Sequence, residues 1–128
     1  MTKIITKKTT NTKFYTFNQN NSGGSFKTSE QAGISEYVII EALNARDANL
    51  KAEVIGLYFN GCENDNDCPC CGDRWSPIYE GDGYGVPYIY NIPLSEVKKS
   101  YYRDSCYVHY LNGKIEKVEF KENDDDTN

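Results

Sequence analysis

Several features of secreted, membrane-spanning and nucleic-acid-binding proteins are missing from this 128-residue sequence. The first ten residues, MTKIITKKTT, contain no apolar segment of the kind found in a signal peptide. No run approaches the roughly 20 apolar residues of a membrane-spanning helix, so we expect no membrane association. We therefore expect the chain to be kept in a reducing cytosol, where cysteines are more often metal ligands or free thiols than disulfides.

Clustered basic side chains are also scarce. The 14 Lys and Arg residues are outnumbered by 19 Asp and Glu, which gives a formal charge of −5. Phosphate binding needs clustered cations, so a nucleic acid is disfavoured as the main partner. The charge is uneven, because residues 1–12 form a basic arm and residues 121–128 an acidic tail. We interpret both as flexible, solvated ends of a single domain spanning residues 13–120.

A catalytic constellation is missing as well. The sequence has one histidine, His109, and spacing places no Ser or Cys nucleophile beside it. A zinc hydrolase would need an open coordination position and a nearby general base, which a thiolate-rich site usually lacks. We therefore expect a protein that is not an enzyme.

The sequence does contain ample strand- and helix-forming material. Strands are predicted at residues 13–18, 25–27, 36–42 and 56–60. The unbroken apolar run EYVIIEA (36–42) indicates a central strand covered on both faces. A helix is predicted from Ala45 to Ile55, with Asn44 as its N-cap and Gly56 ending it. Its alanines repeat at helical spacing and allow close packing on a sheet.

The C-terminal third predicts a short helix and a hairpin. Residues 94–102 carry Leu94, Val97 and Tyr101 at helical spacing. The segments CYVHYL and KIEKVEF flank Asn-Gly, the strongest short-range hairpin signal. A two-residue loop would pair His109 with Glu116 and Cys106 with Glu119. Together the elements predict an α+β fold with a mostly antiparallel sheet, one main helix, a zinc-knuckle-like loop and a C-terminal β-hairpin.

Four of the five cysteines lie in the segment GCENDNDCPCCGDRW, residues 61–75. The C-P-x-C-G form of residues 68–72 is that of a zinc knuckle, in which two thiolates converge on one metal. We predict a structural Zn²⁺ held by Cys62, Cys68 and Cys71, with His109 as the fourth ligand and Cys70 and Cys106 as alternatives to it. Completion of this half-site across a homodimer interface is a further option.

Two other interpretations of the cysteine segment stay open. The thiols are free in the first, and hydrogen bonds alone hold the loop. In the second, C-x-x-C acts in redox chemistry, which requires a lowered thiol pKa. The acidic neighbours would instead raise a thiol pKa; they are Glu63, Asp65, Asp67 and Asp73.

Two groups of residues are candidates for binding a partner. Tyr84, Tyr88 and Tyr90 lie in a Gly/Pro-rich loop with Glu80 and Asp82 nearby, an acidic-aromatic combination that suits a protein with basic groups. Packing in the core is the alternative for these tyrosines. Arg74 and Trp75 follow the knuckle, where Arg74 can pair with a neighbouring acid. Trp75 then either anchors the loop in the core or forms part of a recognition surface.

A small-molecule site is the rival hypothesis. Gly23 and Gly24 in NNSGGSF have backbone amides suited to a phosphorylated ligand or nucleotide signal, with a lysine of the basic arm as its counter-charge and stacking on Trp75 or a Tyr. The segment lacks the G-K-[ST] of a P-loop, so a flexible turn is the alternative.

The blocks NQNNSGGSF and CPCCGDRW, together with EYVIIEA, GLYFNGC and VHYLNGK, resemble a family of small uncharacterised proteins encoded by tailed bacteriophages. The resemblance covers about residues 14–118. It implies an accessory protein that acts in the host cytoplasm by binding and blocking a host or defence-system protein.

Overall fold

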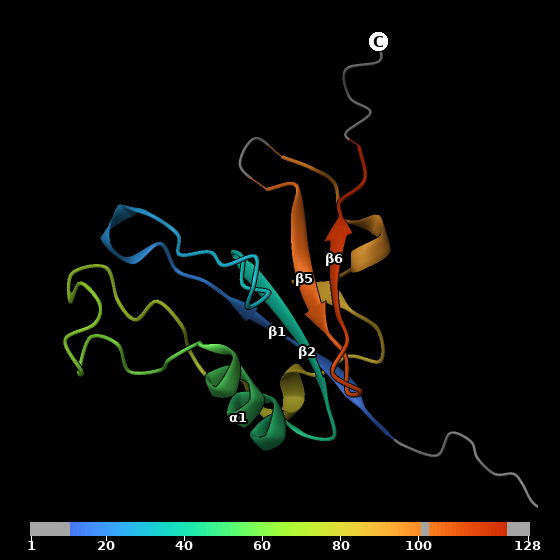
Figure 1. The fold of residues 1–128 in the computed structure, drawn as a ribbon, viewed down its shortest axis with the longest axis horizontal. Coiled ribbons are helices and arrows are strands. Elements are labelled where there is room, and N and C mark those ends of the chain that lie inside the picture. The colour runs from blue at the N-terminus through green and yellow to red at the C-terminus, as the bar shows by residue number, and fades with distance from the viewer. Residues whose placement is uncertain (1–10, 101–102, 123–128) are drawn as a thin grey trace, which may run out of the picture.

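The computed structural model describes residues 11–100 and 103–122. Most of the expected basic arm and acidic tail, and Tyr101, lie outside these residues. The main sheet has four strands in the order β1-β2-β5-β6, with one helix, α1 (Figure 1). The bounds are β1 Lys13–Asn18, β2 Tyr37–Ala42, α1 Ala45–Ile55, β5 Ser105–His109 and β6 Ile115–Glu119. The predicted α+β class is confirmed.

Two of the three strand pairings in the main sheet are antiparallel. β1 pairs with β2 and β5 pairs with β6 in this way, whereas β2 and β5 run parallel. The predicted central position of β2 is confirmed, because it has a strand on each side. Val38 and Ile40 pack in the core on one face of β2, while Tyr37 and Ile39 pack on the other.

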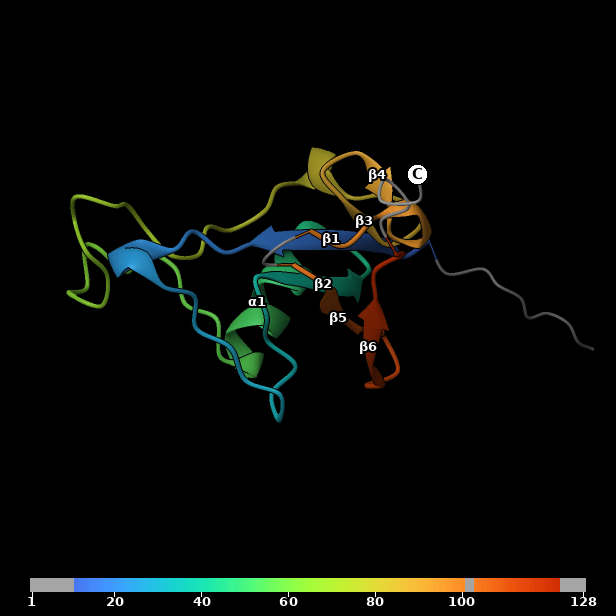
Figure 2. The same cartoon turned by 90° about the horizontal axis from the view of Figure 1, so that it is seen from above.

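The sheet is covered on both faces (Figure 2). One layer is α1, whose buried residues are Ala45, Ala48 and Ala52, so the helix lies close to the strands. As predicted, Asn44 caps it: its Oδ1 accepts from the Asp47 N–H at 2.8 Å. The other layer contains the two-residue strands β3 (Tyr88–Ile89) and β4 (Ile92–Pro93). No helix within the described ranges has the length and apolar character to cross a bilayer.

Three predicted elements are wrong, because side-chain or tertiary bonds replace regular structure. Residues 25–27 form no strand, since the Lys27 N–H donates to the Gln19 side chain rather than to a neighbouring strand. Residues 56–60 pair with no strand of the described part of the chain. The helix over 94–102 is reduced to the turn Leu94–Glu96, because the backbone that follows bonds to Lys121 beyond β6.

The C-terminal hairpin is confirmed, but its predicted register is off by one residue. Tyr110 N–H donates to the Lys114 carbonyl, so the loop has three residues and not two. Gly113, at φ +96°, takes the left-handed position that closes such a loop. His109 therefore pairs with Ile115 instead of Glu116, and Cys106 with Val118 instead of Glu119.

His109 is buried in this hairpin, and its environment keeps it neutral. Its exposed fraction is 2%, and its Nε2 lies 2.8 Å from the Gly33 carbonyl, which identifies Nε2 as the protonated nitrogen. Burial lowers the pKa of His109, and the charge of Lys51 acts in the same direction. A Cβ on Gly33 would lie 2.8 Å from this nitrogen, so the packing here is tight.

We predict that His109 makes stability fall in mild acid. Its unfolded pKa is about 6.5 and its folded pKa is lower, so the unfolded chain binds more protons as pH drops below about 7. The urea midpoint of the wild type should therefore decrease from pH 7 to pH 5. The His109→Gln variant, which retains an N–H donor, should show a flatter profile. Equal declines in the two proteins would contradict the assignment.

Candidate functional site

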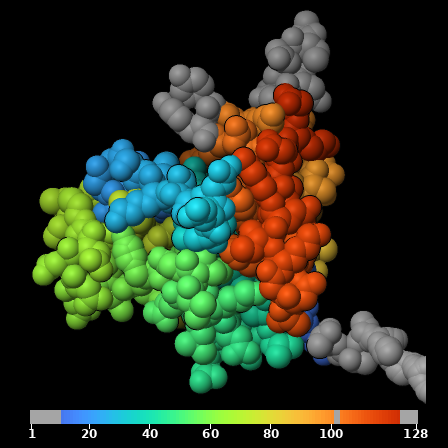
Figure 3. All heavy atoms as spheres, viewed as in Figure 1, coloured from blue at the N-terminus to red at the C-terminus, as the bar shows by residue number. Residues whose placement is uncertain are grey.

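Two loops far apart in the sequence pack side by side at one end of the molecule. We call residues 19–27 the N-terminal loop and residues 61–75 the cysteine loop; Figure 3 shows the first (blue) against the second (yellow-green). Asn20 bonds to the cysteine loop three times, from its N–H to the Arg74 carbonyl at 2.8 Å and from Nδ2 to the carbonyls of Cys71 and Asp73. The blocks NQNNSGGSF and CPCCGDRW, on which the family resemblance rests, therefore form one structural unit.

Arg74 lies at the centre of this unit. Its side chain is buried, and Nη1 donates to Gln19 Oε1 and to the Ser25 carbonyl, each at 2.8 Å. Nη2 donates to the Ser22 carbonyl at 2.6 Å. The planar guanidinium thus satisfies three acceptors of a loop that has no strand of its own. Arg74, a candidate for binding a partner, thus uses these donors within the protein.

Asp67 is the acid that pairs with Arg74. Its Oδ1 lies 3.7 Å from Arg74 Nε and accepts from the Tyr58 hydroxyl at 2.7 Å, while Oδ2 accepts from the Arg74 N–H at 2.8 Å. Burial alone would raise the pKa of Asp67, but these hydrogen bonds and the Arg74 charge hold it below its ordinary value. A Cβ on Gly61 would lie 1.8 Å from Asp67 Oδ2, so only glycine fits there.

Trp75 and the paired glycines differ in burial. Trp75 is 3% exposed and packs in the core with Tyr15, so the anchoring interpretation is confirmed and the recognition-surface one is wrong. Gly23 and Gly24 are exposed and have positive φ in the turn Ser22–Gly24, whose first residue, Ser22, is buried. The Gly24 N–H already donates to the Asn21 carbonyl at 2.8 Å, so it is not free to bind a phosphate.

The cysteine loop brings together its own thiols. All five cysteines are free. Cys62 Sγ lies 3.3 Å from the Cys68 carbonyl. The Cys71 thiol and the N–H groups of Cys71 and Cys70 bond to the Cys68 sulfur and lower its pKa. Burial and a hydrogen bond with Asp73 raise the pKa of Cys62.

The acidic neighbours were predicted to raise the pKa of the thiols. Asp73 has this effect on Cys62, whereas the pKa of Cys68 is lowered. Backbone N–H groups that point at a sulfur are a feature of a zinc knuckle, and the Cys68 turn has them. Within residues 11–100 and 103–122, however, no three His, Cys, Asp or Glu side chains are grouped so that they could hold a metal ion.

The two predicted ligands outside the loop lie in the sheet. Cys106 is fully buried in the core on the face of β2 that carries Ile39, and burial raises its pKa to about 12. His109 bonds to Gly33. β5, which carries both, lies well away from the cysteine loop in two perpendicular views (Figures 1 and 2). Of the three candidates for the fourth ligand, only Cys70 is in the loop.

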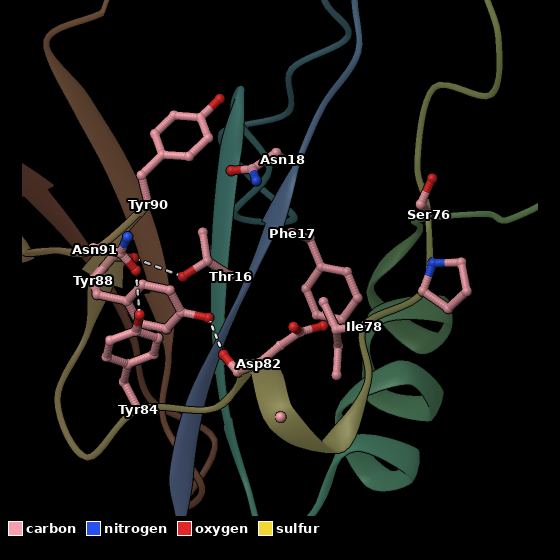
Figure 4. Close-up of a pocket in the computed structure, with 12 residues that line it drawn as sticks. Thr16, Phe17, Asn18, Ser76, Ile78, Asp82, Tyr84, Tyr88, Tyr90 and Asn91 are labelled. Carbon is pink, nitrogen blue, oxygen red and sulfur yellow. Dashed lines mark hydrogen bonds between the residues drawn. The ribbon is translucent and has the colours of Figure 1, made fainter.

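A groove of about 460 Å³ lies beside this unit, along the outer edge of β1 (Figure 4). We call it the tyrosine groove. Its floor is Thr16–Asn18 of β1, and Ser76, Pro77 and Ile78 form one wall. The opposite wall consists of Gly81, Asp82, Tyr84, Tyr88, Tyr90 and Asn91.

The tyrosines predicted as a binding pair do lie together. The rings of Tyr84 and Tyr88 stack with centroids 3.8 Å apart. Tyr84 also bonds to Asn91 through its hydroxyl, and Tyr88 to the Asp82 carbonyl. Tyr88 is 7% exposed and supports the wall, whereas Tyr84 at 36% and Tyr90 at 62% face solvent.

Tyr90, the third tyrosine of the predicted contact loop, is the most exposed aromatic residue in the groove. It lies in the turn between β3 and β4 with φ +51°, a conformation that bulky residues rarely adopt. Its ring packs edge-on against Tyr37, with centroids 6.0 Å apart. No local signal marks this conformation, because it depends on the pairing of β3 with β4 and on Tyr37 from a distant strand.

One wall of the groove is fixed to β1, and the other follows the Arg74–Trp75 anchor. Phe14 and Tyr84 exchange backbone hydrogen bonds of 2.7 and 3.0 Å, and Thr16 Oγ1 donates to the Tyr88 carbonyl at 2.6 Å. The other wall begins at Ser76, immediately after the Arg74–Trp75 anchor. The groove is therefore preformed.

All the residues that line the groove are described in the structure. Asp82 is the only one of them with a charged side chain. Its Oδ2 accepts from the Tyr79 N–H at 2.7 Å, which holds the carboxylate in the turn Glu80–Asp82. No Lys or Arg is among the residues that line the groove. The groove thus combines aromatic rings, amide and hydroxyl groups and one negative charge, which suit a basic or neutral ligand better than a phosphate.

These features define a small α+β protein with a preformed, tyrosine-lined groove at one edge of its sheet. The chain belongs to the family described as Domain of unknown function (DUF7296), whose model matches residues 12–125. No curated protein and no solved structure matches it.

We predict that Arg74→Met destabilises the protein by about 3–5 kcal/mol, because it leaves Asp67 and the loop carbonyls without their donor. The measurement is urea unfolding at pH 7. Arg103→Met is the matched control, since the ion pair of Arg103 with Glu36 is solvent-exposed and should contribute less than about 1 kcal/mol. Comparable losses in the two variants would show that Arg74 does not organise the loops.

Proposed function

We propose that the protein is a non-enzymatic accessory protein of bacteriophage type that binds and modulates a host or defence-system protein in the host cytoplasm. The contact surface is the tyrosine groove and the loop that forms its aromatic wall. The observation that carries the proposal is the density of exposed apolar and aromatic side chains on this loop.

Exposed apolar residues gather between residues 79 and 92. Five large ones there have exposed fractions from 36% to 69%; they are Tyr79, Tyr84, Val86, Tyr90 and Ile92. Contiguous exposed apolar side chains with a polar surround are typical of protein-binding sites, and tyrosine is enriched in them. The carboxylates of Glu80 and Asp82 in the same loop favour a partner with basic groups.

A small phosphorylated ligand receives less support. The volume of the groove is within the range of ligand pockets, but its lining offers no cation to a phosphate. Trp75, which was to stack on a base, is in the core. The polarity of the groove therefore favours a peptide surface over a nucleotide.

Structural zinc remains part of the proposal, with Cys62, Cys68 and Cys71 as ligands and Cys70 as the candidate for the fourth. Its support is the proximity of the thiols in one loop and the N–H groups directed at Cys68. A metal there would stiffen the loop whose last residues lead into Ser76 and the groove.

We predict that a protein captured from host lysate by the immobilised wild type is captured about tenfold less by Tyr90→Asn. Truncation of a tyrosine hot spot typically costs about 2 kcal/mol of binding free energy. Asparagine tolerates the positive φ at this position, so the backbone is retained. Quantitative mass spectrometry of the bound fraction is the measurement.

Leu111→Ala is the control for this capture, because Leu111 is 46% exposed on the hairpin loop, outside the groove. It should bind as the wild type does. A wild type without any specific band, or equal losses in the two variants, would refute the proposal.

We predict that the purified protein contains about one equivalent of zinc, which Cys68→Ser loses together with thermal stability. Cys106→Ser should retain the metal, because Cys106 lies in the sheet core away from the loop. Elemental analysis and thermal unfolding are the measurements. Metal-free wild type, isolated with zinc in the growth medium and no chelator, would leave hydrogen bonds as the sole support of the loop.

A further inference from the structure

Three hydroxyl groups around the tyrosine groove donate their hydrogens within the protein. Tyr84 donates to Asn91 Oδ1, and Tyr88 donates to the Asp82 carbonyl. The Thr16 hydroxyl donates to the Tyr88 carbonyl at 2.6 Å (Figure 4). A hydroxyl group has a single hydrogen, so none of the three can donate to a ligand. Thr16 and Tyr88 are buried, whereas the exposed Tyr84 keeps an oxygen that can accept from outside.

The opposite wall of the groove is also poor in donors. Pro77 has no N–H, and the Ile78 N–H donates to Asn49 Oδ1 at 3.0 Å. The side-chain donors that remain in the lining belong to exposed residues, namely Asn18, Ser76 and Asn91. Few fixed N–H or O–H groups are therefore directed at a ligand between the two walls.

The Asp82 carboxylate provides the groove with an acceptor of full negative charge. Figure 4 shows Asp82 between Tyr88 and Ile78. Its Oδ2 accepts from the Tyr79 N–H at 2.7 Å, which fixes its position. The ion pairs found among residues 11–100 and 103–122 do not include Asp82. A carboxylate has about four lone-pair sites, so most of the accepting capacity of Asp82 is available to a ligand.

We infer that the tyrosine groove binds the guanidinium group of an arginine side chain from the partner protein, with Asp82 as its counter-charge. This inference rests on the proposed protein-binding function and names the group that the groove recognises. A guanidinium has five N–H donors, no acceptor and a permanent positive charge. These properties complement a groove with one carboxylate, few donors and no cation of its own.

The aromatic and apolar surfaces of the groove favour arginine over lysine. Tyr84 stacks on Tyr88 yet stays 36% exposed, and Tyr90 is 62% exposed, so both offer ring surface to a ligand. A planar, weakly hydrated guanidinium stacks on such rings, whereas an ammonium group is compact and strongly hydrated. On the other wall, Pro77 and Ile78 offer an apolar surface to the methylene groups of the arginine.

A second groove, of about 410 Å³, has a different character. Its lining includes Glu36, Arg103 and Lys117, so it carries charges of both signs. Arg103 Nε lies 2.8 Å from Glu36 Oε2, so a cation of the protein already neutralises this acid. An arginine from a partner would have to displace or oppose these cations. The unpaired carboxylate therefore favours the tyrosine groove as the arginine site.

The first test titrates ¹⁵N-labelled protein with N-acetyl-arginine methylamide. The amide signals of Gly81, Asp82 and Asn91 should shift with a Kd of about 1–10 mM. Two matched probes are the controls. The citrulline analogue has nearly the same shape without the charge, and the lysine analogue keeps the charge without the planar fork. Each should bind at least about fivefold more weakly. Equal binding of either analogue, or no shift with the arginine probe, would overturn the inference.

The second test removes the counter-charge. Asp82→Asn keeps an oxygen that can accept from the Tyr79 N–H, and binding of the arginine probe should fall about tenfold. Glu80→Gln is the matched control, because it removes one negative charge from the same turn but lies outside the groove lining. Its side chain can still accept from the Ala45 N–H, as Glu80 Oε2 does at 2.9 Å.

The Glu80→Gln variant should bind the arginine probe within about twofold of the wild type, since a surface charge outside the groove contributes little. Equal losses in the two variants would attribute binding to the general charge of the turn and overturn the inference. If Asp82→Asn does not fold, as judged by circular dichroism, the comparison of the arginine and citrulline probes on wild-type protein still decides.

The outcomes separate this inference from the proposed function. Capture of a host protein that depends on Tyr90, but that neither Asp82→Asn nor excess arginine probe reduces, would keep the function and overturn the arginine assignment. Selective binding of the arginine probe without any Tyr90-dependent capture would refute the function and keep the guanidinium site. A concentration-dependent dimer that Arg46→Gln abolishes would assign the groove to the exposed Arg46 of a second copy and overturn the assignment to a partner protein.

Discussion

The buried guanidinium of Arg74 is the interaction on which this end of the molecule depends. The cysteine loop and the N-terminal loop have few apolar side chains and no strand between them, so a hydrophobic core cannot hold them together. Arg74 instead satisfies acceptors on Gln19, Ser22 and Ser25, and Asp67 neutralises its charge. A lysine could not replace it, because an ammonium group lacks the planar fork that reaches several fixed carbonyls at once.

The order imposed by Arg74 extends to the candidate site. Trp75 enters the core directly after Arg74, and Ser76 then opens one wall of the tyrosine groove. The other wall is tied to the same strand by the backbone bonds between Phe14 and Tyr84. Under the proposed function, a partner would meet a groove whose walls are already in place, which would reduce the ordering cost of binding.

The elements predicted correctly are those with local causes. A central strand follows from its unbroken apolar run, α1 from its cap and alanine spacing, and the hairpin from Asn-Gly. The errors arise where distant residues decide. The hairpin register depends on which residue closes the loop, and the predicted helix over 94–102 is prevented by bonds to Lys121, beyond β6. The parallel pairing of β2 with β5 has no local signal at all.

For the candidate site, the sequence identified the blocks that build it and left several roles open. The burial of Arg74 and Trp75 depends on partners in the N-terminal loop and the core, which spacing along the chain does not reveal. The loop with Tyr84, Tyr88 and Tyr90 was predicted as a contact surface, but only the structure shows that Tyr84 stacks on Tyr88 and that Tyr90 is the most exposed of the three. Stacking and exposure depend on tertiary packing, which the local sequence does not encode.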